Sequence, residues 1–201
     1  VEGGHQEIVN ELLSHQCINV NATDVFGEKA INYAIEGNHV QAMFSILSHR
    51  KLEIYGKKVK ECYKLILAAA SGDIDGLSQL LSEGLDINAQ NEKGDTVLMF
   101  AAKNGHLKVL KYLLTNPNID VNAKKQYGTV ALMLAAAKGH LDIIKALLAH
   151  SDIQVNAKDV LSKTSLIHAT EAGHFHVIGE FLKHEGCEVS GSAEGDYYRL
   201  L

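Results

Sequence analysis

Residues 97–114 read VLMFAAKNGHLKVLKYLL, and residues 131–148 hold a near copy, ALMLAAAKGHLDIIKALL, starting 34 positions later. In each copy, apolar residues recur at the spacing of an amphipathic helix, once before the Gly-His pair and once after it. Each copy therefore predicts two short helices joined by a turn. Repetition at a fixed spacing decides the architecture of the whole chain.

The period runs along the sequence. Six units align on their turn residues, which are 33 or 34 positions apart: Gly4, Asn38, Gly72, Gly105, Gly139 and Gly173. We expect this residue to need a positive φ, which glycine adopts freely and asparagine tolerates. A second marker, Asn-Ala after Val or Ile, recurs at Asn21, Asn88, Asn122 and Asn156. Because such short helices are unstable alone in water, stacking of the units must supply the stability.

The stretch NEKGDTVLMFAAKNGHLKVLKYLLTNPNIDVNA (91–123) and its neighbours resemble ankyrin repeats. The resemblance implies an all-α ankyrin-repeat solenoid of about six stacked helix-turn-helix units with short β-hairpin-like loops. We expect an array over residues 1–189 and a tail, or the start of a further segment, at 190–201. The expected units are 1–22 (partial), 23–56, 57–89, 90–123, 124–157 and 158–189.

The sequence departs from the family pattern in three places. The T-P-L-H signature is replaced in each unit by KAIN (29–32), YKLI (63–66), TVLM (96–99), VALM (130–133) and TSLI (164–167). The stretch SHRKLEIYGKKVKECY (48–63) replaces one hairpin loop, so we expect a distorted hairpin there. The chain starts inside a repeat, which suggests a fragment of a longer protein or a degraded cap.

Histidine is the residue that first suggests chemistry, since eleven are present. Five occupy one repeat position: His5, His39, His106, His140 and His174. The family resemblance implies that this histidine bonds the backbone of the adjacent loop. Equivalent residues of stacked units lie roughly 10 Å apart, too far to share a metal. His174-Phe175-His176 and the pair His184 and Cys187 are incomplete as metal sites, so we predict no metal and no cofactor.

Nothing in the sequence assembles a catalytic site. Cys62, expected on a hairpin, would need an oriented histidine to act as a nucleophile, and none is positioned by the sequence. No phosphate-binding glycine loop or hydrolase motif is present. We therefore predict no catalytic residue and a protein that is not an enzyme.

The composition limits where the protein is located and what kind of partner it binds. No apolar run reaches the roughly 18 residues of a membrane span, and the first residues do not form a signal peptide. Three scattered cysteines predict free thiols in a reducing compartment, so we expect the cytoplasm, or a host cytoplasm for a secreted effector. Residues 51–150 hold 13 basic and 10 acidic residues, a net charge of +3, between two acidic ends. This favours a protein partner with an acidic segment and gives no argument for nucleic acid or membrane.

The family resemblance places a partner on the concave face, which the hairpin tips and the exposed edges of the first helices line. The residues predicted to bind are Val25, Phe26, Glu36, Val59, Lys60, Glu92, Lys93, Lys103, Asn104, Gln126, Tyr127, Lys138, Val160 and Leu161. Exposed aromatic residues commonly anchor interfaces. The alternative is that Phe26, Tyr127 and Leu161 pack against the next hairpin.

The sequence thus predicts a monomeric protein-protein interaction module without catalysis of its own. Two alternatives remain open: the targeting or substrate-binding arm of a larger enzyme or secreted bacterial effector, and a purely structural spacer. Asn88 also resembles the ankyrin asparagines that asparaginyl hydroxylases modify, which makes it a candidate hydroxylation site.

Overall fold

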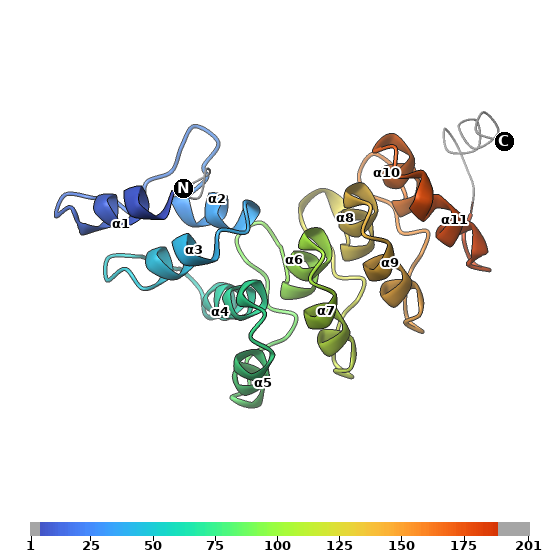
Figure 1. The fold of residues 1–201 in the computed structure, drawn as a ribbon, viewed down its shortest axis with the longest axis horizontal. Helices are drawn as coiled ribbons and strands as arrows, with labels where there is room; N and C mark the ends of the chain where they lie inside the picture. The colour runs from blue at the N-terminus through green and yellow to red at the C-terminus, as the bar shows by residue number, and fades with distance from the viewer. Residues whose placement is uncertain (1–4, 189–201) are drawn as a thin grey trace.

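The computed structural model describes residues 5–188, and the expected tail at 190–201 lies outside them. Within this range the chain forms helices and no strand, which confirms the all-α class (Figure 1). The eleven α-helices of the described part are α1 Gln6–Ser14, α2 Ala30–Glu36, α3 Val40–Leu47, α4 Lys57–Ser71, α5 Ile74–Ser82, α6 Val97–Asn104, α7 Leu107–Leu114, α8 Ala131–Lys138, α9 Leu141–Leu148, α10 Ser165–Glu171 and α11 Phe175–Lys183. A short 3₁₀ turn, η1, covers Gln126–Gly128.

Each unit pairs an inner helix with the outer helix that follows it. The inner helices α6, α8 and α10 pack side by side, and so do the outer helices α7, α9 and α11. Figure 1 shows these pairs following one another as a solenoid. The inner helices meet through alanines that are fully buried, such as Ala101 and Ala135, and the outer helices fill the core with leucines such as Leu110 and Leu113. Small residues on one helix let the backbones approach, so successive units stack closely.

The turn between the two helices has the predicted backbone. Gly72, Gly105, Gly139 and Gly173 have φ between 69° and 73°, and Asn38 has φ of 54°. Glycine is needed for space as well as for φ, because a Cβ on Gly139 would lie 2.7 Å from the His174 ring. The turn therefore fixes both the local chain direction and the approach of the next unit.

Hairpin-like loops precede the inner helices of four units. Their closing backbone hydrogen bonds run from Asp24 to Glu28, Asn91 to Asp95, Lys125 to Thr129 and Asp159 to Lys163. Thr96 and Thr164 then cap α6 and α10 by accepting hydrogen bonds from the amides of Met99 and Ile167. The loops are turns, since only one isolated β-bridge, Thr23 to Lys29, occurs in the described residues.

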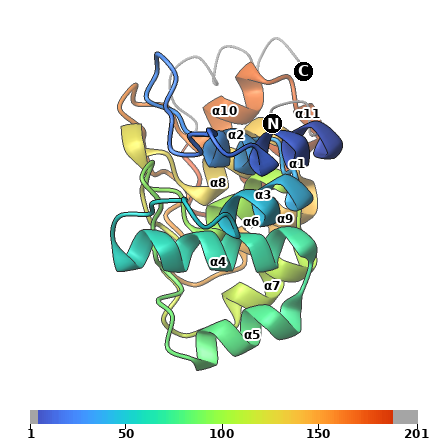
Figure 2. The ribbon, with the colours of Figure 1, turned by 90° about the vertical axis from the view of Figure 1, so that its left-hand side faces the viewer.

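The unit over residues 57–89 has no hairpin, so the expectation of a distorted one was wrong. Instead α4 begins at Lys57, directly after Gly56 with φ of 95°, and runs for 15 residues. It is the long helix in the foreground of Figure 2. The segment KKVKECYKLILAAAS lacks a turn-forming residue and carries apolar residues at helical spacing, so the helix extends through the hairpin position. Val59 and Lys60, predicted at a hairpin tip, lie in the first turns of this helix instead.

The missing hairpin changes how its neighbours meet. The hairpin of residues 91–95 reaches across the gap to the hairpin of residues 24–28 and to α2. Lys29 pairs with Glu92 at 3.0 Å, and Lys93 pairs with Glu28 at 2.8 Å and with Glu36 at 2.6 Å. Tyr63 of α4 donates a hydrogen bond to Glu92 beneath this junction. Two units that are not consecutive are thereby joined directly.

Candidate partner-binding surface

The four hairpins form one continuous edge, the hairpin ledge, made of residues 24–28, 91–95, 125–129 and 159–163. Within the hairpins, side chains of Asp24, Asn91 and Asp159 each accept two hydrogen bonds from backbone amides two and four residues ahead. Between hairpins, the Gln126 amide donates to the Lys93 carbonyl at 3.3 Å and the Val160 amide to the Tyr127 carbonyl at 3.0 Å. Backbone bonds thus join the hairpins of residues 91–95, 125–129 and 159–163. Ion pairs of the tip side chains Glu92 and Lys93 join this row to residues 24–29 and to α2.

Apolar side chains project from the tips. The exposed fractions are 94% for Val25, 83% for Phe26, 73% for Tyr127, 66% for Val160 and 69% for Leu161. At these exposures the side chains do not pack against the next hairpin, which was the alternative interpretation. A row of exposed apolar residues on one edge is typical of an interaction surface.

Tyr127 has a backbone that its side chain does not favour. Its φ is 64°, in the left-handed region that costs a non-glycine residue about 1 to 2 kcal/mol. Its ring is exposed, so folding recovers little of that cost by burying the side chain.

The structure brings Phe26, Glu92, Lys93 and Gln126 together around one shallow pocket of about 370 Å³ at the junction of the first two hairpins. Lys93 is partly buried there, and Glu36, at the end of α2, faces it. Burial lowers the pKa of Lys93, but the hydrogen bonds to Glu28 and Glu36 outweigh it and leave the pKa raised. Glu92, Lys93 and Glu36, which the sequence predicted to bind a partner, thus pair within the chain.

Two other lysines on the inner helices have a different environment. Lys103, at the end of α6, is partly buried, and this desolvation lowers its pKa even though Glu36 opposes the effect. Lys138 occupies the equivalent place at the end of α8 and is exposed. The side chain of Asn104 donates to the Phe100 carbonyl of its own helix at 3.0 Å. Neither Lys103 nor Lys138 takes part in an ion pair among residues 5–188, whereas Lys93 and Lys125 are paired with acidic side chains.

The repeated histidines His140 and His174 hold the stack, as the family resemblance implied. His140 bonds the Lys103 carbonyl at 3.0 Å and His174 bonds the Ala137 carbonyl at 3.2 Å. His106 differs, because its ring contacts the side-chain amide of Asn38, two units earlier, at 3.3 Å. Burial lowers the pKa of His106, which also stacks on the Phe100 ring. This exception again follows from the irregular unit over residues 57–89.

Sequence reasoning missed two further histidine contacts. His168 of α10 bonds the Asp159 carboxylate at 2.9 Å, and His176 bonds the Gly139 carbonyl at 3.0 Å. His176 is particular to the last unit, whereas His168 repeats a contact of the second unit, where Tyr33 at the equivalent position donates to Asp24. Among residues 5–188, no group of three or more His, Cys, Asp or Glu side chains is arranged to hold a metal ion.

Cys62 lies inside α4 rather than on a hairpin and is fully buried. Burial raises the pKa of its thiol to about 12, so the nucleophilic thiolate is scarcely populated near neutral pH. The Sγ atom donates to the Asp95 carbonyl at 3.2 Å. This residue is part of the core.

Asn88 has the same structural task as its equivalents. Its side chain donates to the Asn118 carbonyl at 2.7 Å and accepts from the Asp120 amide at 2.9 Å. Asn21, Asn122 and Asn156 make the same pair of bonds to the following unit. Hydroxylation of Asn88 stays a prediction, and a modifying enzyme would have to release both bonds to reach the side chain.

These features define the class of the protein, a helical repeat protein whose hairpins line one edge. Residues 65–159 match the family described as ankyrin repeats in three copies. An ankyrin repeat protein of Rickettsia felis is 40% identical over 60 residues, which cover 30% of this chain and 91% of that protein. The chain belongs to the ankyrin-repeat family.

Larger proteins contain similar segments. A probable E3 ubiquitin-protein ligase of rice is 34% identical over 88 residues, 44% of this chain. An ankyrin repeat domain-containing protein of Stachybotrys chartarum is 34% identical over 113 residues, 55% of this chain. The matched segments span only 17% and 5% of these two relatives. No helix in the described residues has the length and apolar character to cross a membrane.

Proposed function

We propose that the chain is a protein-protein interaction module that binds its partner along the hairpin ledge and catalyses no reaction. The observation that carries this proposal is the row of exposed apolar tips, Val25, Phe26, Tyr127, Val160 and Leu161. The fold does not use these side chains, and Tyr127 adopts an unfavourable backbone to present its ring. Few rigid aromatic anchors commonly dominate the affinity of an interface.

The charge of the same face supports a partner with an acidic segment. Lys103 and Lys138 lie behind the tips on the inner helices, and Glu28 and Glu36 already neutralise Lys93. A partner segment that crosses the ledge and carries acidic residues toward Lys103 and Lys138 is complementary to this arrangement. Binding to such a segment will weaken as salt is added.

The proposal is tested by removing the tips. The triple variant Phe26→Ser, Tyr127→Gly and Leu161→Ser is compared with the unaltered chain in quantitative affinity purification from the native cell. A Lys111→Ser, Lys145→Ser variant is the control, because it alters exposed residues of the outer helices α7 and α9. Proteins retained by the control and lost from the triple variant support the proposal. Identical recoveries from all three would favour the structural spacer.

A second candidate is that the array is the targeting or substrate-binding arm of a larger protein, either an enzyme or a secreted effector. The relatives favour it, since the matched segment spans only 17% of the rice ubiquitin ligase. In that case the same ledge binds the substrate or target, and the reaction belongs to another domain. We propose a cytoplasmic location for either candidate, supported by the free cysteines Cys17, Cys62 and Cys187.

A further inference from the structure

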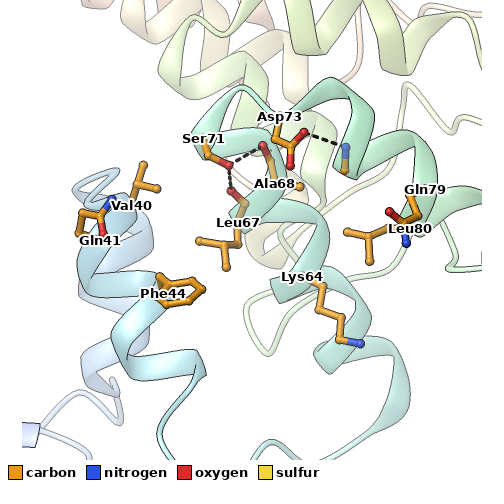
Figure 3. A pocket seen from close by; sticks show the side chains of 11 residues that line it. Val40, Gln41, Phe44, Lys64, Leu67, Ala68, Ser71, Asp73, Gln79 and Leu80 are labelled. Carbon is orange, nitrogen blue, oxygen red and sulfur yellow. Dashed lines mark hydrogen bonds between the residues drawn. The ribbon is translucent and has the colours of Figure 1, made fainter.

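A groove opens on the other side of the molecule, away from the hairpin ledge, where the irregular unit interrupts the stack. The outer helix α9 packs against both α7 and α11. In the described part of the chain, the outer helix α3 packs against α4 and makes no comparable contact with the next outer helix, α5. A groove of about 620 Å³ lies between α3 and α5, with α4 as its floor. Figure 3 shows Phe44 reaching from α3 toward Leu67 of α4, with Leu80 of α5 on the other side.

The groove exposes positions that every other two-helix unit buries. Ala68 is partly exposed, whereas its equivalents Ala34, Ala101, Ala135 and Ala169 are fully buried. Leu80 is partly exposed, whereas its equivalents Ile46, Leu113, Leu147 and Phe181 are at most 1% exposed. In those units the positions lie in contacts between packed helices. The surface left open here therefore presents positions that packed helices cover in the other units.

Phe44 is an apolar residue where the repeat uses polar or small ones. Its equivalents in the other units are Asn10, Ser78, Lys111, Lys145 and Gly179. It is 58% exposed, so the fold buries less than half of it. Opposite, Gly76 stands where other units carry Ala42, Val109, Ile143 and Val177, and its lack of a side chain widens the groove.

The charges of the lining give the groove a direction. Lys64 lies at one end and Asp73 at the other (Figure 3). Asp73 is engaged in capping α5, since its carboxylate accepts from the Gly76 amide at 2.8 Å. Lys64, and Lys60 one turn before it on α4, are exposed and take part in none of the ion pairs within residues 5–188. The Lys64 end of the groove therefore carries a positive charge without an ion-pair partner among the described residues.

We propose that this groove binds an amphipathic helix of a second protein, with the apolar face of that helix against Phe44, Leu67 and Leu80 and an acidic residue at its Lys64 end. Helix-in-groove docking uses apolar anchors at positions i, i+3 or i+4 and i+7. A segment of about 8 to 12 residues, some 12 to 18 Å of helix, matches the eight-residue α3 that forms one wall. The site is independent of the hairpin ledge, so one chain can hold two partners.

The test uses the complete 201-residue chain and a synthetic helical peptide of 12 residues with leucines along one face and two glutamates at one end. Its affinity is measured by fluorescence anisotropy. Phe44→Lys places in the groove the residue that Lys111 and Lys145 provide in other units, so the variant should fold, as its thermal melt will show. We expect it to weaken peptide binding at least about tenfold, while Phe175→Lys, at an exposed phenylalanine of α11 outside both surfaces, leaves binding unchanged.

A charge swap tests the direction of binding. A second peptide, with lysines in place of the two glutamates, should bind the unaltered chain several-fold more weakly and recover on Lys64→Glu. Equal binding of the first peptide to the unaltered chain and Phe44→Lys, or no binding at millimolar concentration, would overturn the proposal. So would sedimentation showing that the unaltered chain is a dimer and Phe44→Lys a monomer, because a second copy would then occupy the groove.

Discussion

Replacing Lys93 by Met tests the junction that joins two non-consecutive units. Lys93 binds Glu28 at 2.8 Å and Glu36 at 2.6 Å, and its side chain is 23% exposed. Ion pairs at the surface contribute up to about 1 kcal/mol, and hydrogen bonds to charged groups in partly buried places somewhat more. Both glutamates can still reach solvent after the change, so we expect a loss of about 1 to 2 kcal/mol in the free energy of unfolding.

Urea unfolding measures that loss, and a thermal melt should fall by between about 2 and 8 °C in a chain of this size. Hydrogen exchange gives the local readout, since the amides of residues 24–36 should exchange faster while those of α8 and α9 do not change. Lys138→Met is the matched control, because Lys138 is exposed and makes no ion pair within the described residues. It should cost at most about 0.5 kcal/mol.

A double-mutant cycle with Glu36→Gln isolates the pair, and we expect a coupling energy of at least about 0.5 kcal/mol. Equal stability of Lys93→Met and Lys138→Met, together with a coupling energy of zero, would contradict this prediction. That result would mean that the hairpin of residues 91–95 does not dock on α2 in solution.

Three further predictions concern the hairpins and the core. Hydrogen bonds from Tyr33 and from the Glu28 amide lower the pKa of Asp24. Burial raises the pKa of Asp159, but hydrogen bonds from the Lys163 amide and from His168 outweigh burial and leave this pKa lowered. Their contribution to stability is therefore present above the unfolded pKa of about 4 and lost as pH falls below it. The double variant Asp24→Asn, Asp159→Asn introduces the residue that Asn91 provides in its own hairpin, so the hairpins should be kept. Its free energy of unfolding should fall less between pH 5 and pH 3 than that of the unaltered chain, and an equal fall would contradict this. Ser162 has φ of 60° where the other hairpins carry Gly27, Gly94 and Gly128, so Ser162→Gly should raise stability by about 0.5 to 1 kcal/mol in urea unfolding, and a loss would show that its backbone is not strained. Iodoacetamide should label the exposed Cys17 at native pH and leave Cys62 unlabelled until urea unfolds the chain, whereas rapid labelling of Cys62 would show that α4 opens readily.

The architecture can be predicted from the sequence because the residue pattern of one unit is repeated along the chain. The apolar spacing predicts the helices, and the turn residues predict a positive φ that the structure has at Asn38 and at four glycines. The His140 and His174 bonds also follow from the repeat, through the family resemblance. These features depend on contacts inside a unit or between consecutive units, which is the information that a repeat contains.

The departures arise where one unit breaks the pattern. The segment after Gly56 continues as helix, which removes a hairpin, and the consequence falls on residues far apart in the sequence: Glu92 meets Lys29 and Tyr63, and Lys93 meets Glu28 and Glu36. A repeat alignment compares consecutive units, so it could not place these partners. The same break uncovers Ala68 and Leu80. The sequence signals for the groove are Phe44, at a position that is polar or small elsewhere, and Gly76, where other units carry a larger apolar residue.

The proposed function requires that the hairpin ledge bind a partner through side chains that the fold does not need. Its most direct test is photo-crosslinking in the native cell, with a benzophenone amino acid placed at residue 127 on the ledge or at residue 111 on the outer helices. We predict a discrete covalent adduct with another protein from residue 127 and none of the same mass from residue 111. Absence of an adduct from residue 127, or the same adduct from both positions, would contradict the claim.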